Sequence, residues 1–177
     1  MALGFLEKRS RRLLGGALQV RSAGTWARPG SGATEEAVAV AAERGIDIAS
    51  HLSTPFAPEL AEWADVVITM TAEQRDEVAD GAPSAATKTF TLKELVPILG
   101  ELPPEEGQPS RESLLARIAE ADRLRREGAA PQPADEDVAD PLGLSMEAYR
   151  AAAWEIEELI DATVRGLAGQ PVSAEEA

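Results

Sequence analysis

Short apolar runs alternate with helical patterns along the first half of the chain, and this alternation limits the fold more than any other feature. Residues 18–23, 65–70 and 88–91 have the composition of strands. The run Val66-Val67-Ile68 contains no polar residue, which is typical of a strand buried on both faces. Strands that alternate with helices form a parallel sheet joined by right-handed crossovers. The sequence therefore predicts an α/β domain.

Helix signals fill the intervals between these runs. Thr34 and Ser145 are placed to cap helices, while Thr71 and Thr91 open capping boxes directly after predicted strands. The predicted helices cover residues 2–14, 34–44, 57–63, 71–80, a short stretch from 91, 110–127 and 145–167. The first of them has no cap. We expect one domain over residues 1–168, followed by a flexible tail at 169–177.

Composition excludes several classes of partner. With 17 basic against 31 acidic side chains, the net charge of −14 repels nucleic acid and anionic lipid. No apolar run approaches the roughly 20 residues that span a bilayer, and the chain contains no cysteine. The acidic run 135–140 begins like a calcium-binding loop but has Asp140 where that loop needs glycine. We therefore expect a cytoplasmic protein without cofactor, metal, nucleic acid or membrane partner.

Two segments near opposite ends of the chain carry the chemical information. They are residues 21–25 (Arg-Ser-Ala-Gly-Thr) and 140–143 (Asp-Pro-Leu-Gly). Between them lie Glu-Arg-Gly-Ile-Asp at 43–47, His-Leu-Ser at 51–53 and the strand that ends in Met70-Thr71, and after them comes the long helix bearing Tyr149. In order and spacing, these segments resemble the low-molecular-weight protein tyrosine phosphatase family over roughly residues 1–167, with 101–139 the loosest part.

The resemblance implies a three-layer α/β/α fold with a short parallel sheet of four strands. It also implies hydrolysis of phosphotyrosine in proteins, or of small aryl phosphates, through a phosphocysteine intermediate. Asp140 matches the family's general acid, and the proline after it favours an extended backbone that projects the carboxylate. Ser22 matches a serine that braces the phosphate-binding loop, and His51 matches a structural histidine.

Two further positions bear on the substrate. Trp26 is placed like residues that line the family's cleft, so we expect either substrate contact or ordinary packing from this side chain. Leu142 and Gly143 stand where phosphotyrosine-selective members often have tyrosines. The resemblance therefore does not extend to selectivity for phosphotyrosine.

The family's nucleophile is the cysteine of a Cys-x5-Arg-Ser-Pro loop, which connects the first, central strand to a helix. Met1-Ala2 resembles the start of that helix, so we expect a phosphatase-like domain truncated at its N-terminus and inactive as it stands. An internal methionine taken as the initiator and a genuine loss of the loop are both open. The alternative is a non-catalytic interaction module derived from the same fold. Thioredoxin-coupled arsenate reductases share the fold but need downstream cysteines, so this activity is disfavoured.

Overall fold

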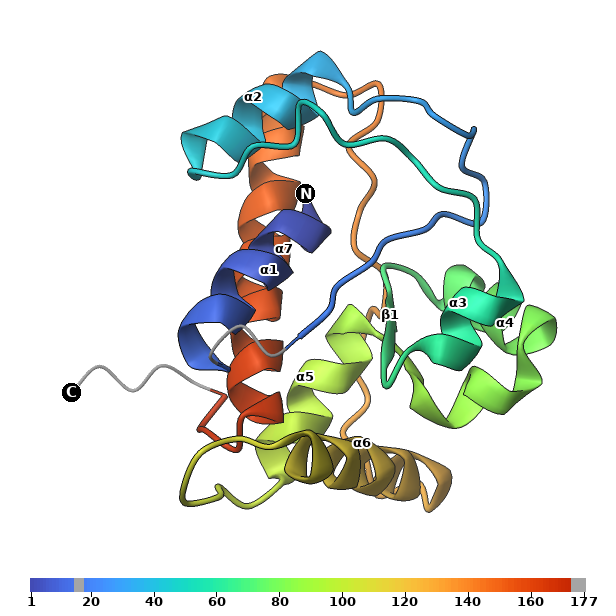
Figure 1. The fold of residues 1–177 in the computed structure, drawn as a ribbon, viewed down its shortest axis with the longest axis vertical. Coiled ribbons are helices and arrows are strands. Elements are labelled where there is room, and N and C mark those ends of the chain that lie inside the picture. Colours follow the sequence, from blue (N-terminus) through green and yellow to red (C-terminus); the bar gives the residue numbers. More distant parts are fainter. Residues whose placement is uncertain (15–17, 173–177) are drawn as a thin grey trace.

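Two helices from opposite ends of the sequence pack side by side. The computed structural model describes residues 1–14 and 18–172, and in it α1 (Ala2–Leu13) lies along α7 (Met146–Leu167) (Figure 1). Gly4 allows α1 to approach Ile46, which lies outside both helices, because a Cβ at this position would lie 2.3 Å from a side-chain carbon of Ile46. Phe5 fills the interface and is 1% exposed.

The remaining elements follow the order that the sequence predicts. They are the helices α2 (Glu35–Glu43) and α3 (Pro58–Trp63), strand β1 (Val67–Thr69), helix α4 (Ala72–Gly81), the 3₁₀ helix η1 (Pro83–Lys88), strand β2 (Thr89–Thr91), and the helices α5 (Leu92–Glu101) and α6 (Arg111–Arg126). The predicted helices are thus confirmed to within about two residues at each end. α5 continues through Pro97 and does not stop at it.

Side-chain caps begin the helices as expected, with one change. Thr91 and Glu94 form the complete capping box of α5. Thr71 accepts a hydrogen bond from the Gln74 amide, but the Gln74 side chain accepts from the amide of Met70. The capping box predicted at Thr71 therefore forms with one difference: the Gln74 side chain bonds the amide of Met70 and not that of Thr71.

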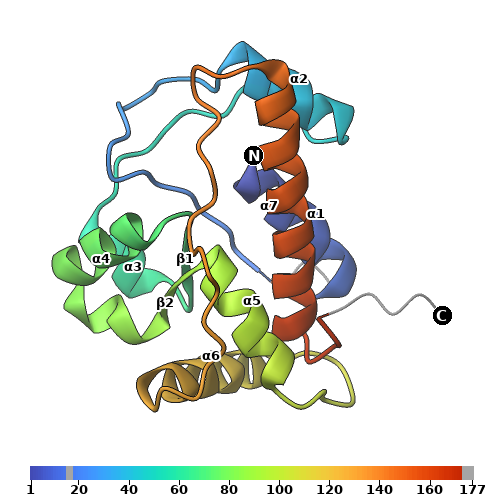
Figure 2. The same cartoon turned by 180° about the vertical axis from the view of Figure 1, so that it is seen from behind.

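β1 and β2 form a parallel pair in which Val67 lies opposite Thr89, which confirms the predicted α/β class. Successive side chains of a strand point to opposite faces. Val67 packs against the cluster of Ala61 and Val78 from α3 and α4, whereas Ile68 packs against the cluster around Phe90. Helices thus cover both faces of the pair. Figure 2 shows the connector from α6 to α7 running past it on the way to α7.

The prediction of a strand at 18–23 is wrong for this structure. Residues 18–23 have no strand assignment, and their backbone makes no backbone hydrogen bond to any residue that the structure describes. Pairing resumes only at Gly24, whose amide donates to the Thr54 carbonyl. A strand exists only with a ladder partner, and a cavity separates this segment from β1. Of the four strands expected from the resemblance, the described residues contain β1 and β2.

Two other expectations concern burial and the chain's end. Residues 66–68 are only half-buried, because they line this same cavity, so burial on both faces is incomplete. Of the predicted tail, 173–177 lie outside the described residues, and the carbonyl of Gly169 accepts a bond from the Glu105 amide. The boundary at 168 stays a prediction. Within the described part of the chain, no helix is both long and apolar enough to cross a membrane.

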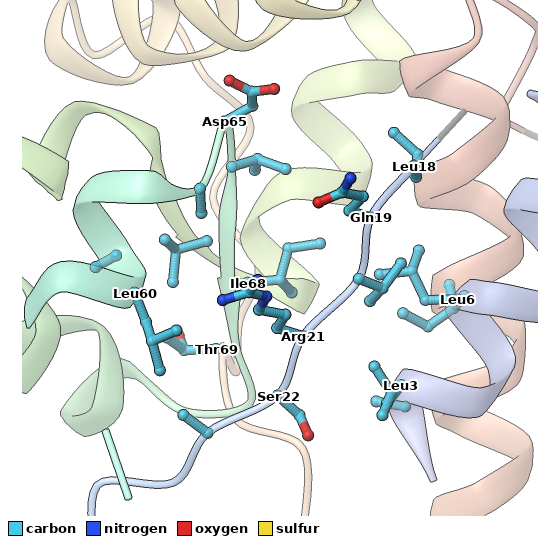
Figure 3. A pocket seen from close by; sticks show the side chains of 18 of the residues that line it. Leu3, Leu6, Leu18, Gln19, Arg21, Ser22, Leu60, Asp65, Ile68 and Thr69 are labelled. Atoms are coloured by element: carbon cyan, nitrogen blue, oxygen red, sulfur yellow. The ribbon is translucent and has the colours of Figure 1, made fainter. Parts of the chain in front are cut away.

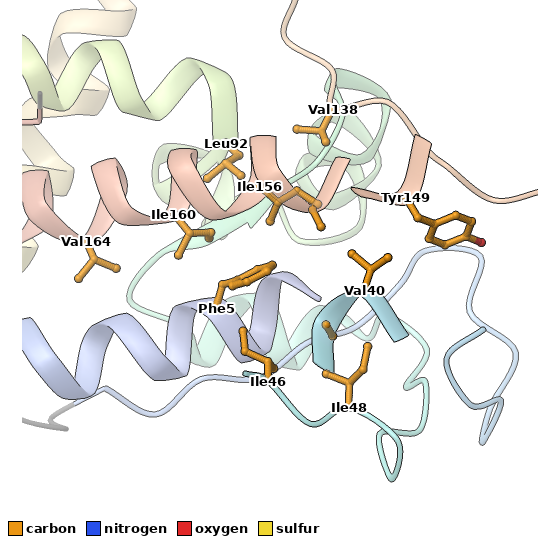
Figure 4. Close-up of a cluster of buried hydrophobic side chains, with 12 residues drawn as sticks. Phe5, Val40, Ile46, Ile48, Leu92, Val138, Tyr149, Ile156, Ile160 and Val164 are labelled. Atoms are coloured by element: carbon orange, nitrogen blue, oxygen red, sulfur yellow. The ribbon is translucent and has the colours of Figure 1, made fainter. Parts of the chain in front are cut away.

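The packing of α1 leads to a first prediction. Figure 4 shows Phe5 among the buried side chains of α7 and its neighbours, whereas Leu3 lines the cavity. Phe5→Ala should lower the free energy of unfolding by about 3–5 kcal/mol in urea titrations. Leu3→Ala should cost less than the roughly 2–5 kcal/mol of a packed leucine, since its side chain already faces open space. Equal losses from the two variants would contradict this assignment.

Candidate functional site

A cavity of about 830 Å³ lies between the extended segment 18–25, β1 and the first turns of α1. Its lining is mainly apolar. Figure 3 shows Leu3 and Leu6 from α1, Ile68 from β1 and Leu60 from α3 among the side chains around it. Among the residues that the structure describes, β1 pairs with β2 along one edge, and its other edge faces this space. The cavity is therefore bounded by backbone with free hydrogen-bonding capacity on two sides.

Two pairs of side chains in this lining contact each other through polar or charged groups near segment 18–25. The Arg21 guanidinium lies 4.4 Å from the centre of the Trp63 ring, a cation–π contact. Ser22 Oγ and His51 Nε2 lie 3.5 Å apart, and both residues line the cavity. Within the described residues, no carboxylate hydrogen-bonds to this imidazole. The pair therefore lacks the acidic partner of a serine-hydrolase triad, and the bracing role predicted for Ser22 and the structural role of His51 stay predictions.

Asp140 lies near the carboxyl end of β1. It is exposed, and its Oδ1 accepts a hydrogen bond from the Leu142 amide at 3.0 Å. Two residues earlier, the amide of buried Val138 donates to the carbonyl of Met70, which follows β1 and lines the cavity. Two residues span at most about 7 Å. This anchor holds the carboxylate of Asp140 close to the edge of the sheet where parallel strands end.

Three further contacts fix the segment that precedes Asp140. The Oδ1 atom of Asp137 accepts from the Ala72 amide at 2.8 Å, at the start of α4. The Lys93 ammonium donates to the Asp137 carbonyl at 2.6 Å. Arg75 donates to the carboxylate of Glu136 at 2.5 Å. The connector is thus tied to α4 and α5 at consecutive residues, although it has no regular secondary structure.

Two charges at the connector, on Lys93 and Asp135, persist at neutral pH. The Lys93 ammonium donates a hydrogen bond to the Glu155 carboxylate at 2.8 Å, and this bond raises the pKa of Lys93. The Asp137 amide and the Lys93 charge lower the pKa of Asp135, the next carboxylate along the connector. Lys93 therefore stays protonated and Asp135 ionised across the physiological range.

Trp26 lies outside this cavity but next to it. Its side chain is 85% exposed, and its indole N–H donates to Glu77 Oε1 at 3.2 Å. With Phe56 and Pro58, these two residues line a second, open pocket of about 390 Å³. Thr25 and Phe56 line both spaces, so the pocket adjoins the cavity. Whether Trp26 contacts substrate stays a prediction.

Sequence reasoning missed four residues that shape the site. Lys93, Arg75 and Asp137 hold the connector, and Glu77 lies under Trp26. The only signal was the acidic run 135–137, and no spacing pairs it with basic residues about 45 to 60 positions earlier.

Comparison with known proteins fits this geometry. The sequence pattern of the family described as low molecular weight phosphotyrosine protein phosphatase matches residues 1–105. The protein-arginine-phosphatase of Geobacillus stearothermophilus is 34% identical over 161 residues, which cover 91% of this chain and 82% of that protein.

Two solved structures share the fold. The YwlE arginine phosphatase from Geobacillus stearothermophilus has a TM-score of 0.67 at 32% identity, over 94% of this chain and 82% of that one. A low molecular weight protein tyrosine phosphatase from T. tengcongensis has a TM-score of 0.64 at 30% identity, over 90% and 84%. These matches confirm the resemblance and the α/β fold predicted from the sequence.

The ties of the connector lead to a second prediction. Asp137→Ala removes the acceptor for the Ala72 amide and should cost about 1 kcal/mol of stability, as for a lost helix cap. Hydrogen exchange should accelerate at the amides of Ala72 and Val138, because the segment before Asp140 loosens. Glu106→Ala is the charge-matched control, since this exposed glutamate has no side-chain hydrogen bond or ion pair within the described residues. Unchanged exchange at Val138 would show that Asp137 does not hold the connector.

Proposed function

Because this chain belongs to the low molecular weight phosphotyrosine protein phosphatase family, we propose that it forms the acid-supplying and substrate-facing part of a protein phosphatase that acts on phosphoarginine. The support for arginine comes first from the relatives, which carry the name arginine phosphatase. The second support is Leu142, which is 67% exposed after Asp140-Pro141. An aliphatic side chain there offers no aromatic wall for a phosphotyrosine ring.

Asp140 has the chemistry that this reaction requires. A thiolate attacks phosphorus, so that an S–P bond forms while the P–N bond to the guanidinium breaks. Protonated Asp140 gives its proton to the leaving nitrogen. Water then attacks the phosphocysteine, Asp140 takes up a proton from it, and phosphate and the thiolate are released.

The thiolate is the part that this chain lacks, since it contains no cysteine. We therefore propose that the chain on its own does not turn over substrate, and that a strand followed by a Cys-x5-Arg loop completes it. General acid–base help alone contributes roughly 10²–10⁴ in rate, less than the ~10⁶-fold or larger accelerations that enzymes typically reach. Location in the cytoplasm also stays a prediction from composition.

The cavity is the observation that carries this proposal. It lies between the unpaired segment 18–23 and the free edge of β1, where an added strand would hydrogen-bond on both sides. A strand parallel to β1 would end near Met70 and Ser22, on the side where Val138 anchors the connector to Asp140. The first turn of α1 also borders the cavity and has no side-chain cap, so its amides are available to phosphate oxygens.

Complementation in trans tests this proposal. A synthetic peptide with an apolar strand followed by Cys-x5-Arg-Ser-Pro is added to the 177-residue chain, and phosphate release from a phosphoarginine peptide is measured. We expect no release from the chain or the peptide alone and measurable release from the mixture. Replacing the peptide's cysteine by serine should abolish release, and Asp140→Asn should lower it about 10²–10⁴-fold.

Two outcomes would refute this account. Hydrolysis by the chain alone would mean that the cysteine loop is not needed. Binding of the peptide without any turnover would favour the non-catalytic interaction module instead.

Substrate choice gives a separate prediction. In the complemented enzyme, a phosphoarginine peptide should be cleaved with higher kcat/KM than a phosphotyrosine peptide of otherwise identical sequence. Leu142→Tyr should shift the ratio toward phosphotyrosine by about two- to tenfold, since an aromatic pair contributes ~0.5–1.5 kcal/mol. Leu144→Tyr, at another exposed leucine of the same loop, is the control. A wild-type preference for phosphotyrosine would contradict the assignment to arginine.

A further inference from the structure

We infer that the pocket of Trp26, Phe56 and Glu77 binds the positively charged side chain of an unmodified arginine in the protein substrate. The idea that the arginine belongs to a substrate rests on the proposed function. The binding itself rests only on the pocket.

Glu77 provides a carboxylate of which only one oxygen accepts a hydrogen bond within the described residues. Its Oε1 accepts from the Trp26 indole, while Oε2 is shielded from solvent and has no hydrogen-bond partner within the described residues. A shielded, unsatisfied carboxylate oxygen is costly, and a charged N–H donor offsets that cost best once a rotation of the Glu77 side chain presents Oε2 to the pocket. Among residues 1–14 and 18–172, no lysine or arginine lines the pocket and could serve as this donor.

The surroundings add to the negative potential. Gly81, the last residue of α4, lines the pocket, and the carbonyl end of a helix attracts cations. Glu73 and Asp80 lie four residues before and three residues after Glu77, so all three carboxylates share one side of α4. Glu73 and Asp80 are exposed and form no ion pair within the described part of the chain. No cation therefore cancels the charge of this helix face.

The aromatic groups favour a guanidinium over an ammonium. Trp26 offers an exposed indole whose face can stack on a planar cation. Phe56 is held against the end of α4, because a Cβ at Gly81 would meet its ring at 3.2 Å. The indole's own bond to Glu77 fixes it beside the carboxylate, so stacking and hydrogen bonding act on one ligand group.

The position of the pocket suits a neighbouring residue of the substrate. It shares Thr25 and Phe56 with the cavity, and extended chain advances about 3.3–3.6 Å per residue. An arginine a few residues from the phosphorylated one would thus reach the pocket while the phosphate lies at the cavity.

Binding to the 177-residue chain tests this inference without any turnover. The probes are short glycine–serine peptides that carry one arginine, one lysine or one citrulline, the last being an uncharged analogue of arginine. Binding is followed by NMR through the indole N–H signal of Trp26, which Trp26→Phe identifies among the three tryptophans. The arginine peptide should shift this signal and bind more tightly than lysine, and citrulline should not bind.

Two variants separate charge from stacking. Glu77→Gln keeps an acceptor for the indole and should weaken arginine binding about tenfold or more. Trp26→Phe keeps an aromatic face and should retain much of the binding, whereas Trp26→Ala should abolish it. Glu106→Gln, a remote and exposed charge change, should have no effect.

Equal binding of citrulline, unchanged affinity in Glu77→Gln, or lysine binding as tight as arginine would each overturn the assignment. Arginine binding without phosphatase activity in the complemented chain would leave this inference standing while the proposed function fails. Activity with no binding here would show the reverse.

Discussion

Backbone pairing along β1 is the interaction on which the rest of this structure depends. β1 is joined to β2 on one edge, and this pair, covered on both faces by helices, sets the position of α4, α5 and the connector that leads to Asp140. The other edge faces a cavity of about 830 Å³ lined mainly by apolar side chains. An unpaired strand edge beside an apolar hollow is a template for another strand. The edge of β1 that lacks a partner in the described residues therefore also borders the proposed catalytic site.

The acid of the proposed reaction is held by side chains and not by secondary structure. Consecutive contacts from Arg75, Lys93 and the Met70 carbonyl fix residues 136–138, and Asp140 follows with its carboxylate exposed. Exposure suits a group that must meet a substrate and exchange protons with water. The neighbouring pocket at Trp26 and Glu77 gives the same end of the molecule a second, charge-selective surface. The cavity and this pocket adjoin each other, since Thr25 and Phe56 line both.

Local patterns predicted most elements because their causes are local. The caps at Thr34, Thr91 and Ser145 begin helices through bonds to amides three residues away, so their effect is readable in the sequence. The strand at 18–23 failed for the opposite reason, since strand formation depends on a partner that composition does not reveal. The family resemblance predicts Asp140 as the general acid, but the contacts that hold the segment before it join residues about 45 to 65 positions apart.

The sequence by itself determined the α/β class, the helix boundaries, the family and the absence of a cysteine, because each follows from residue type or short-range order. Only the tertiary structure decided which polar groups meet. It placed Glu77 beneath Trp26, brought the 135–137 acidic run to Arg75 and Lys93, and opened the space between 18–23 and β1. These outcomes depend on how distant segments pack, and the free energy of packing is a property of the assembled core and not of any short stretch.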